Sequence, residues 1–176
     1  MGREDERRGA FEELFTAHYW AVRGYVLRRD ASAVEDTVAE TFLVAWRRLD
    51  SLSDDPLPWL LGVARRVLAN QQRAERRRTA LTARLRSVVS GQVPDWEPPS
   101  AMSDDLAAAM VRLSPREREA LLLVAWEGLE PDRAARAAGC SPAAFRVRLH
   151  RARRHVAAAL TDSATPPRSP IAGDAR

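Results

Sequence analysis

Apolar residues recur at the spacing of an α-helix through the N-terminal half of this chain of 176 residues. Three such stripes stand out, and each predicts one helix that packs by one face. The first comprises Phe11, Leu14, Phe15, His18, Val22 and Val26. The second comprises Val34, Val38, Phe42, Ala45, Trp46 and Leu49. The third comprises Leu60, Val63, Ala64, Val67 and Leu68.

Local signals indicate where these helices begin and end. Ser32 is expected to start the second helix, with Glu35 completing a capping box. The segment 50–58 is rich in Ser, Asp and Pro, which is typical of a loop, and the third helix then begins near Trp59. No window alternates apolar and polar residues with a period of two, so the fold class we predict is all-α.

The C-terminal part carries two further helix starts of a common type. Residues 114–117, Ser-Pro-Arg-Glu, combine a capping Ser, a Pro in the first turn and a Glu three positions after the Ser. Residues 141–142, Ser-Pro, repeat this start and open a longer helix. Between them, segment 130–138 has the length of a short helix and ends at Gly139. A short helix, a tight turn and a longer basic helix predict a helix-turn-helix, a unit that enters the DNA major groove.

The last of these helices is expected to bury one stripe and to expose its arginines. The stripe is Phe145, Leu149, Ala152 and Val156, which we expect to pack on Leu121, Leu122, Ala134 and Ala138. In a recognition helix the first turns reach base edges, and later cationic side chains hold phosphates. We therefore expect the base readers to be Ala144, Arg146, Val147 and Arg148, and the phosphate anchors to be Arg151 and Arg154. Cys140 falls in the turn and is expected to fill the core.

All 28 basic residues are arginine, and they are unevenly spread. Residues 65–86 hold eight arginines and one acid, a bias that favours contact with a nucleic-acid backbone over a solvated helix face. Residues 91–105 hold four acids, three prolines and no base, which is the composition of a linker. We therefore divide the chain into an N-terminal domain (9–86), a flexible acidic linker (87–105), a C-terminal helix-turn-helix domain (106–161) and a disordered tail (162–176).

Other classes of function find little support in the residues. The three histidines and the single cysteine lack the spacing of metal ligands, and there is no Gly-rich phosphate loop or nucleophile elbow. We therefore predict no enzymatic activity, no metal and no cofactor. No run of about 18 apolar residues is present to span a membrane, and the N-terminus lacks the apolar core of a signal peptide. The expected location is the cytoplasm.

Two stretches of the N-terminal domain resemble the second conserved region of the extracytoplasmic-function (ECF) sigma factors, small bacterial transcription initiation factors of the sigma-70 family. They are residues 11–15, Phe-Glu-Glu-Leu-Phe, and the run from Val34 to Arg47. In that family the polar face of this second helix docks on the coiled coil of the largest subunit of core RNA polymerase. The resemblance implies that the polymerase contacts are made by Asp36, Glu40, Thr41 and Arg47.

Residues 58–70 resemble the promoter-melting segment of the family, and loop 50–56 matches its specificity loop, which holds a base flipped from the non-template strand. Extruding a base costs on the order of a few kcal/mol of stacking, which a pocket must offset. The residues implied in melting and in recognition of the downstream element are Asp50, Ser51, Leu52, Ser53, Trp59, Arg65, Arg66, Asn70, Arg73 and Arg77. For Trp59, a place in the core and a role as a stacking platform both stay open.

The most specific matches are residues 113–123 and 148–154, which resemble the fourth region of the family, the reader of the upstream promoter element. The resemblance implies two partners: core RNA polymerase, and promoter DNA both as duplex upstream element and as melted non-template strand. A monomeric free state and an anti-sigma factor as a further partner also follow from it. The acidity of the linker suits a basic channel made for RNA.

Two other functions stay open at this point. An autonomous helix-turn-helix regulator would bind duplex DNA alone, normally as a dimer, but nothing N-terminal resembles a receiver or a ligand pocket, and no dimerisation heptads are found. A helical RNA-binding protein would explain the arginines but not two separately patterned domains. We therefore predict a two-domain helical sigma factor that binds core polymerase, directs it to promoters and helps to melt them.

Overall fold

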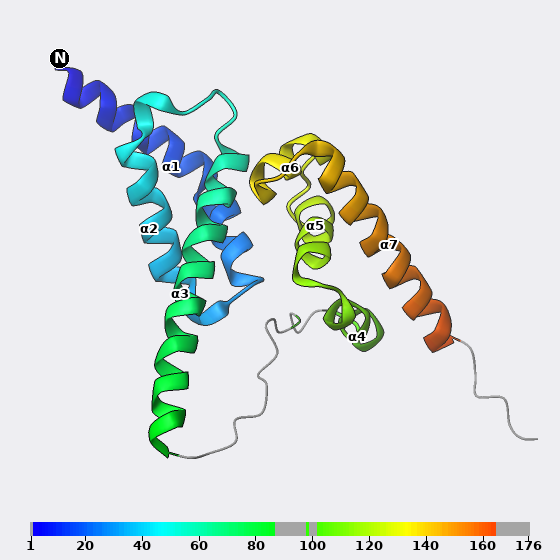
Figure 1. Cartoon of the computed structure of the whole chain (residues 1–176). Helices are drawn as coiled ribbons and strands as arrows, with labels where there is room; N and C mark the ends of the chain where they lie inside the picture. Colours follow the sequence, from blue (N-terminus) through cyan, green and yellow to red (C-terminus); the bar gives the residue numbers. More distant parts are fainter. Residues whose placement is uncertain (1, 87–97, 99–101, 165–176) are drawn as a thin grey trace, which may run out of the picture.

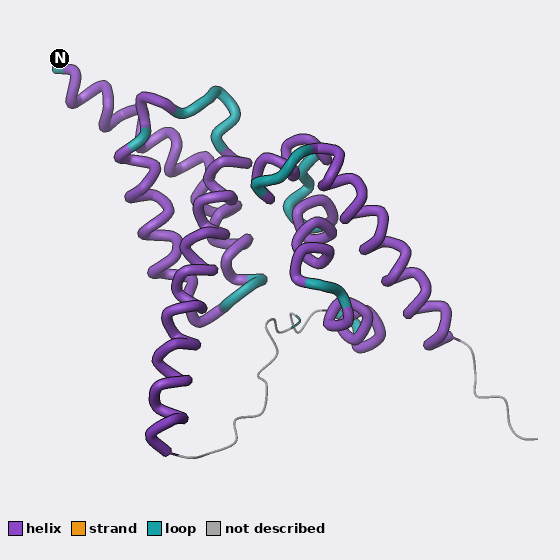
Figure 2. The backbone as a smooth tube through the Cα atoms, in the orientation of Figure 1, coloured by secondary structure: helices purple, strands orange, loops and turns teal. Residues whose placement is uncertain are grey.

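The structure is a computed structural model that describes residues 2–86, 98 and 102–164. Within these residues every regular element is a helix, which confirms the predicted all-α fold. The helices form two lobes that lie side by side, an N-terminal lobe of α1–α3 and a C-terminal lobe of α4–α7 (Figure 1). Short loops join consecutive helices within each lobe (Figure 2).

The N-terminal lobe is a bundle of α1 (Arg3–Leu27), α2 (Val34–Arg47) and α3 (Leu57–Arg86). The apolar stripes of the three helices face one another, as their spacing predicts, and Val22, Val38, Phe42 and Leu60 are almost fully buried. Phe15 is 38% exposed, although its ring still contacts that of Phe42. Among the described residues the largest fully buried side chain is instead that of Tyr25, which lies outside the predicted stripe.

The start of α2 differs from the prediction. Asp30, not Ser32, provides the cap: its carboxylate accepts a hydrogen bond of 3.1 Å from the Ser32 backbone N–H and closes the 3₁₀ turn Ala31–Ala33. Helix α2 then begins at Val34 without a side-chain cap. The carboxylate of Asp30 also accepts a hydrogen bond from the Ser32 hydroxyl, so that hydroxyl is engaged outside the helix. The predicted capping box between Ser32 and Glu35 is therefore wrong.

The C-terminal lobe contains α4 (Asp104–Arg112), α5 (Pro115–Ala125), α6 (Pro131–Ala138) and α7 (Pro142–Ala164). The predicted capping box is confirmed, because Ser114 and Glu117 each accept a hydrogen bond from the other's backbone N–H. The hydroxyl of Ser141 likewise accepts from the Ala144 N–H at 3.2 Å. Gly139 ends α6 with a φ of 65°, the left-handed conformation that a glycine adopts without strain.

The C-terminal lobe extends beyond residues 106–161, the boundaries predicted from composition, at both ends. Helix α4 begins within the predicted linker. Its first two residues are aspartates, and their negative charges interact favourably with the positive end of the helix dipole. Helix α7 continues past residue 161 to Ala164, so the first residues of the predicted tail are helical. In the N-terminal lobe, α1 begins at Arg3, ahead of residue 9. The remaining linker and tail predictions lie almost wholly outside the described residues.

A buried arginine joins α4 to α5. Arg118 donates from Nε to the carbonyl of Met110 at 3.0 Å, and from Nη2 to the carbonyls of Val111 and Leu113 at 3.2 and 3.0 Å. These carbonyls stand at the end of α4, where no further turn of helix can satisfy them. Arg118 thus fixes the angle between α4 and the helix-turn-helix.

The lobes meet where α3 passes α6 (Figure 1). A Cβ atom added at Gly62 of α3 would stand 3.3 Å from the carbonyl oxygen of Ala137 in α6, so the absence of a side chain permits this close approach. One cluster of buried apolar side chains runs across the junction and includes Leu61 from the first lobe and Leu123 and Phe145 from the second. The lobes therefore share a continuous core.

The turn at Gly139 gives a test of the fold. Gly139→Ala is expected to lower the free energy of unfolding by about 1–2 kcal/mol, because alanine in the left-handed region places its Cβ against the carbonyl oxygen. Chemical denaturation measures the change. Gly9→Ala in α1 is the control: an added Cβ meets nothing within 4 Å there, and the better helix former should raise stability by up to about 1 kcal/mol. Equal stability of the Gly139→Ala variant and the wild type would contradict this view of the turn.

Candidate nucleic-acid interface

Helix α2 leaves one stripe of its surface uncovered. Asp36, Glu40, Leu43 and Arg47 follow one another at helical spacing, and all four are exposed, Leu43 by 42%. Three of them belong to the predicted polymerase-binding set, and Leu43 adds an apolar contact that sequence reasoning missed. Leu43 lies three residues after Glu40 and four before Arg47, and this spacing alone could have placed it on the same helix face.

Thr41, the fourth residue predicted to contact polymerase, does not lie on this stripe. Its side chain is fully buried, and its hydroxyl donates a hydrogen bond of 2.7 Å to the carbonyl of Thr37 in the previous turn. A threonine hydroxyl is easily satisfied in this way within a helix, which lets Thr41 face the core. The structure therefore removes Thr41 from the exposed docking surface.

Loop 50–56 closes on itself and presents short polar side chains. The hydroxyl of Ser51 donates to the carbonyl of Arg48 at 2.9 Å, and that of Ser53 donates to the carbonyl of Asp55 at 3.2 Å. Asp50, Ser51 and Ser53 are exposed, whereas Leu52 is half-buried. Trp59, at the start of α3, is partly buried and packs on the hydrophobic core, so the structure favours its place in the core.

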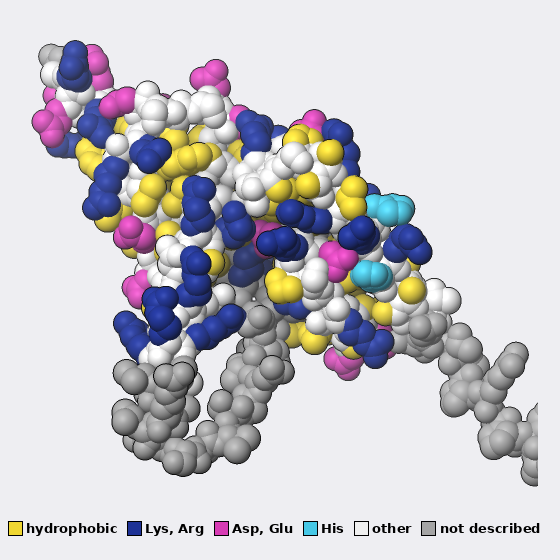
Figure 3. Space-filling model, viewed as in Figure 1, with side chains coloured by type: hydrophobic (Ala, Val, Ile, Leu, Met, Phe, Trp, Pro, Cys, Tyr) yellow, Lys and Arg dark blue, Asp and Glu magenta, His cyan; other side chains and the backbone are white. Residues whose placement is uncertain are grey.

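Helix α3 carries a basic groove along its exposed side. Its volume is about 460 Å³, and it is lined by Arg65, Arg66, Ala69, Asn70, Gln72, Arg73 and Arg76. Arg73 donates to the Asn70 side-chain oxygen at 2.5 Å and to the carbonyl of Ala69 at 3.1 Å, which holds two of the predicted DNA-contacting residues in one arrangement. Arg77 is exposed on the same helix. Dark blue side chains gather along this part of α3 and at the junction of the lobes (Figure 3).

Helix α7 buries the stripe that its spacing predicts. Phe145, Leu149 and Ala152 are at most 4% exposed and Val156 is partly buried, which leaves the arginines on other faces. Cys140 is partly buried against the core, in keeping with its predicted role.

The residues predicted to read bases lie in three different settings on α7. Val147 is 51% exposed, Ala144 is half-buried, and Arg146 donates to Asp132 of α6 at 2.7 Å. Arg148 lines the cleft between the lobes. The predicted phosphate anchors, Arg151 and Arg154, are both exposed.

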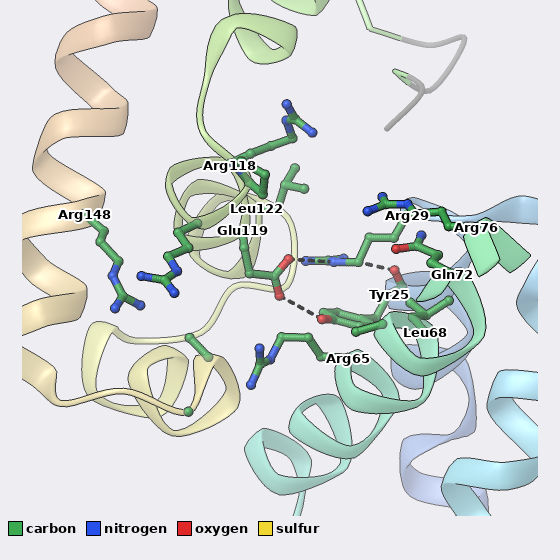
Figure 4. A pocket seen from close by; sticks show the side chains of 15 residues that line it. Tyr25, Arg29, Arg65, Leu68, Gln72, Arg76, Arg118, Glu119, Leu122 and Arg148 are labelled. Carbon is green, nitrogen blue, oxygen red and sulfur yellow. Dashed lines mark hydrogen bonds and ion pairs between the residues drawn. The ribbon is translucent and has the colours of Figure 1, made fainter. Parts of the chain in front are cut away.

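A network of buried charges ties the lobes together. Arg29, which follows the end of α1, donates from Nε to Glu119 at 2.9 Å and from Nη1 to Glu127 at 3.0 Å. The hydroxyl of Tyr25 donates to the second oxygen of Glu119 at 2.7 Å, and Arg28 pairs with Glu127. The dashed lines in Figure 4 show how Glu119 joins α5 to α1.

The electrostatics of this network favour its charged form. Although burial lowers the pKa of Arg29, the negative charges of Glu119 and Glu127 and the hydrogen bond to Glu119 raise that pKa above its ordinary value, so the guanidinium stays charged. Burial is also the main reason why the pKa of Tyr25 lies well above its ordinary value, which keeps the phenol protonated as a donor. Nη2 of Arg29 is nevertheless buried without a hydrogen-bond partner in the described residues.

A second bridge between the lobes is centred on Asp55 of the loop. Its carboxylate accepts two hydrogen bonds from Arg133 of α6, at 3.0 and 2.6 Å, and one from Arg136 at 2.7 Å. The hydrogen bond from Arg133 is the main reason why the pKa of Asp55 lies below its ordinary value. Sequence reasoning missed both bridges, because their partners are about 80–100 residues apart and no spacing rule relates them.

Among the described residues, no group of three or more His, Cys, Asp or Glu side chains is placed to hold a metal ion. No helix in that part of the chain combines the length and apolar character needed to cross a bilayer.

Comparison with known proteins assigns the two lobes to one family. Residues 14–78 match the family described as Sigma-70 region 2, and residues 103–156 match Sigma-70, region 4. The RNA polymerase sigma factor CarQ of Myxococcus xanthus is 31% identical over 152 residues, which cover 84% of this chain and 87% of CarQ. The chain belongs to the sigma-70 family of RNA polymerase sigma factors.

Further similarities place this sigma factor among the ECF proteins. The ECF RNA polymerase sigma factor EcfG of Rhodopseudomonas palustris is 30% identical over 140 residues, which cover 76% of this chain and 75% of EcfG. The sigma factor RpoE of Bartonella quintana, in a co-crystal structure with the anti-sigma factor NepR, has the same fold, with a TM-score of 0.65. That alignment covers 86% of this chain and 96% of RpoE at 24% identity. The predicted family and function, an ECF sigma factor, are thus confirmed, and the family is one of transcription initiation factors rather than of enzymes.

Because of the bridge at Asp55, we expect the free energy of unfolding of this sigma factor to depend on pH in a specific way. Because the pKa of Asp55 is lowered by folding, its carboxylate stabilises the folded state at pH values above its ordinary pKa of about 4, and this contribution is lost as pH falls through the lowered value. Asp55→Asn should cost at most about 1 kcal/mol near neutral pH, since solvent screens this partly exposed pair.

Urea denaturation at several pH values measures this effect. The difference in unfolding free energy between wild type and Asp55→Asn should be constant near neutrality and should shrink below about pH 4. Asp54→Asn is the matched control, because the neighbouring Asp54 is exposed and is not part of the bridge. The same pH profile for both variants would show that the bridge does not stabilise the fold.

Proposed function

We propose that this sigma factor uses three separate surfaces in transcription initiation, each with its own binding partner. The α2 stripe of Asp36, Glu40, Leu43 and Arg47 docks on core RNA polymerase. Loop 50–56 and the basic groove of α3 hold the melted non-template strand. Helix α7 reads the duplex upstream element. The protein acts in the cytoplasm, where polymerase and chromosome are found, and performs no chemical reaction itself.

The observation that carries this proposal is that one chain presents two separate basic surfaces, one on α3 and one on α7. An autonomous regulator needs only the helix-turn-helix of α6 and α7 to bind duplex DNA. The groove on α3 is not part of that unit, and its row of guanidinium groups suits the backbone of a single strand. This second surface favours a sigma factor, which binds both duplex and melted DNA, over an autonomous regulator, which binds duplex DNA alone.

The uncovered stripe of α2 supports the docking part of the proposal. An exposed leucine between two carboxylates and a guanidinium is a mixture typical of protein–protein contacts, with an apolar centre and a charged surround. The acids favour a basic partner surface, since complementary charges steer association and fix register.

The proposed DNA contacts are the predicted residues, most of which are exposed, whereas Leu52 and Arg65 are half-buried. On the N-terminal lobe they are Asp50, Ser51, Leu52, Ser53, Arg65, Arg66, Asn70, Arg73 and Arg77, with Trp59 supporting the loop from the core. On α7 we propose that the half-buried Ala144 and the exposed Arg146 and Val147 meet base edges, and that the exposed Arg151 and Arg154 meet phosphates. Arg148 joins the base-reading set when the two lobes separate.

An anti-sigma factor belongs to the same proposal. The related RpoE of Bartonella quintana is seen in complex with the anti-sigma factor NepR. We propose that a partner of this kind also binds the present chain, which is otherwise a monomer when free.

Reversal of charge on α2 tests the docking assignment. Asp36→Arg combined with Glu40→Arg should weaken assembly with core polymerase at least about a hundredfold, since like charges brought face to face at an interface cost several kcal/mol. Both side chains are exposed, so the fold should persist by circular dichroism. Glu12→Arg with Glu13→Arg, exposed on α1, is the matched control and should assemble normally. Full run-off transcription by the α2 variant would refute the docking surface.

A further inference from the structure

A cleft between the two lobes gathers unusual positive charge. Its volume is about 580 Å³, within the range of sites that hold small molecules. The arginines that line it come from both lobes and are Arg29, Arg65, Arg76, Arg116, Arg118 and Arg148. Glu119 is the only carboxylate among the lining residues, and its charge is already engaged by Arg29. Among these lining residues, positive charge is therefore in large excess.

Some of the guanidinium groups in this cleft are already committed. Arg118 is held by the carbonyls at the end of α4, and Arg29 is held by Glu119 and Glu127. Arg116 and Arg148 make no ion pair within the described residues. Figure 4 shows Arg65 and Arg148 reaching toward the same space from opposite lobes.

Two buried donors at this cleft lack acceptors. The side chain of Arg29 is 9% exposed, yet its Nη2 has no hydrogen-bond partner among residues 2–86, 98 and 102–164, and Nε of Arg65 likewise has none there. Both residues line the cleft. Both nitrogens are inaccessible to solvent, so they do not themselves meet a ligand in the cleft, but they leave the positive charge of the two guanidinium groups incompletely compensated at the cleft wall.

We propose that this cleft binds a small anion built of linked phosphates, such as inorganic tripolyphosphate or the phosphate chain of a nucleotide. Guanidinium groups match phosphate oxygens in pairs, and linked phosphates offer enough oxygens for several arginines at once. The apolar side chains of Leu68 and Leu122 form part of the wall and give room for an organic group. Duplex DNA is too wide to enter a space of this size between packed lobes.

The position of the site gives the bound anion a consequence. Arg29 and Arg65 come from the N-terminal lobe, whereas Arg116 and Arg148 come from the C-terminal lobe, so one ligand holds both lobes together. Arg65 and Arg148 are also proposed DNA contacts, and an occupied cleft therefore excludes promoter DNA from both. This consequence rests on the proposed function, but binding of the anion does not, because it is measured on the free chain.

Titration calorimetry on the full chain, in phosphate-free buffer with moderate salt, tests the proposal. Tripolyphosphate should bind saturably with one site per chain. Arg116→Gln and Arg65→Gln should each weaken it about tenfold, the loss expected for one charge-assisted hydrogen bond. Arg153→Gln on α7 removes the same charge from an exposed site that does not line the cleft, and it should bind like the wild type.

A parallel titration with ATP distinguishes the two sources of phosphate. Tighter binding of ATP than of tripolyphosphate would identify a nucleotide, and equal affinity would identify the phosphate chain alone. Equal weakening by all three substitutions would show that the anion only screens surface charge, which overturns the proposal. Absence of saturable binding by either anion would overturn it as well. Because Arg116 is exposed, its variant should fold even if Arg65→Gln does not.

Discussion

The buried guanidinium of Arg29 is the contact on which the arrangement of the two lobes depends. It is charged and nearly inaccessible to water, and the carboxylates that neutralise it, Glu119 and Glu127, both come from the other lobe. Removing one partner of a buried ion pair costs about 3–5 kcal/mol, because the remaining charge stays desolvated. The charge of Arg29, in the turn after α1, is therefore neutralised only while α5 and the turn that follows it lie against the first lobe.

Apolar packing and charge pairing act together at this junction. Gly62 lets α3 approach α6 closely, and Leu61, Leu123 and Phe145 belong to one cluster of buried side chains across the junction. Around that cluster lie ion pairs, including the exposed bridge from Asp55 to Arg136. An interface between domains that mixes apolar and charged contacts resembles those that form and separate reversibly. Such a junction is compatible with a protein whose two DNA-binding surfaces must reach different parts of a promoter.

Most local elements of this structure were predictable from sequence, because each depends on residues a few positions apart. The stripes of α2, α3 and α7 fix which faces are buried, and the capping box at Ser114 and the glycine at position 139 fix helix ends. Where two local rules competed, sequence reasoning chose wrongly: Asp30 and Ser32 are both good caps, and only the three-dimensional path of the chain selects Asp30.

The candidate site was only partly predictable for the same reason. The exposed stripe of α2 and the arginines of α3 follow from periodicity, but Thr41 was included only through the family resemblance, and the structure buries its side chain. The pairing of Arg29 with α5, and the arginine-lined cleft, depend on how two lobes meet across a long stretch of chain. No spacing within the sequence encodes that meeting, so these features come from the structure alone.

Core RNA polymerase freed of other sigma factors provides the most direct test of this account. The purified chain and the core enzyme would be mixed and separated on a sizing column at moderate salt. The account predicts that they elute together as a complex with one copy of each. Separate elution, combined with tight binding of duplex DNA by the chain alone, would contradict the account and indicate an autonomous regulator instead.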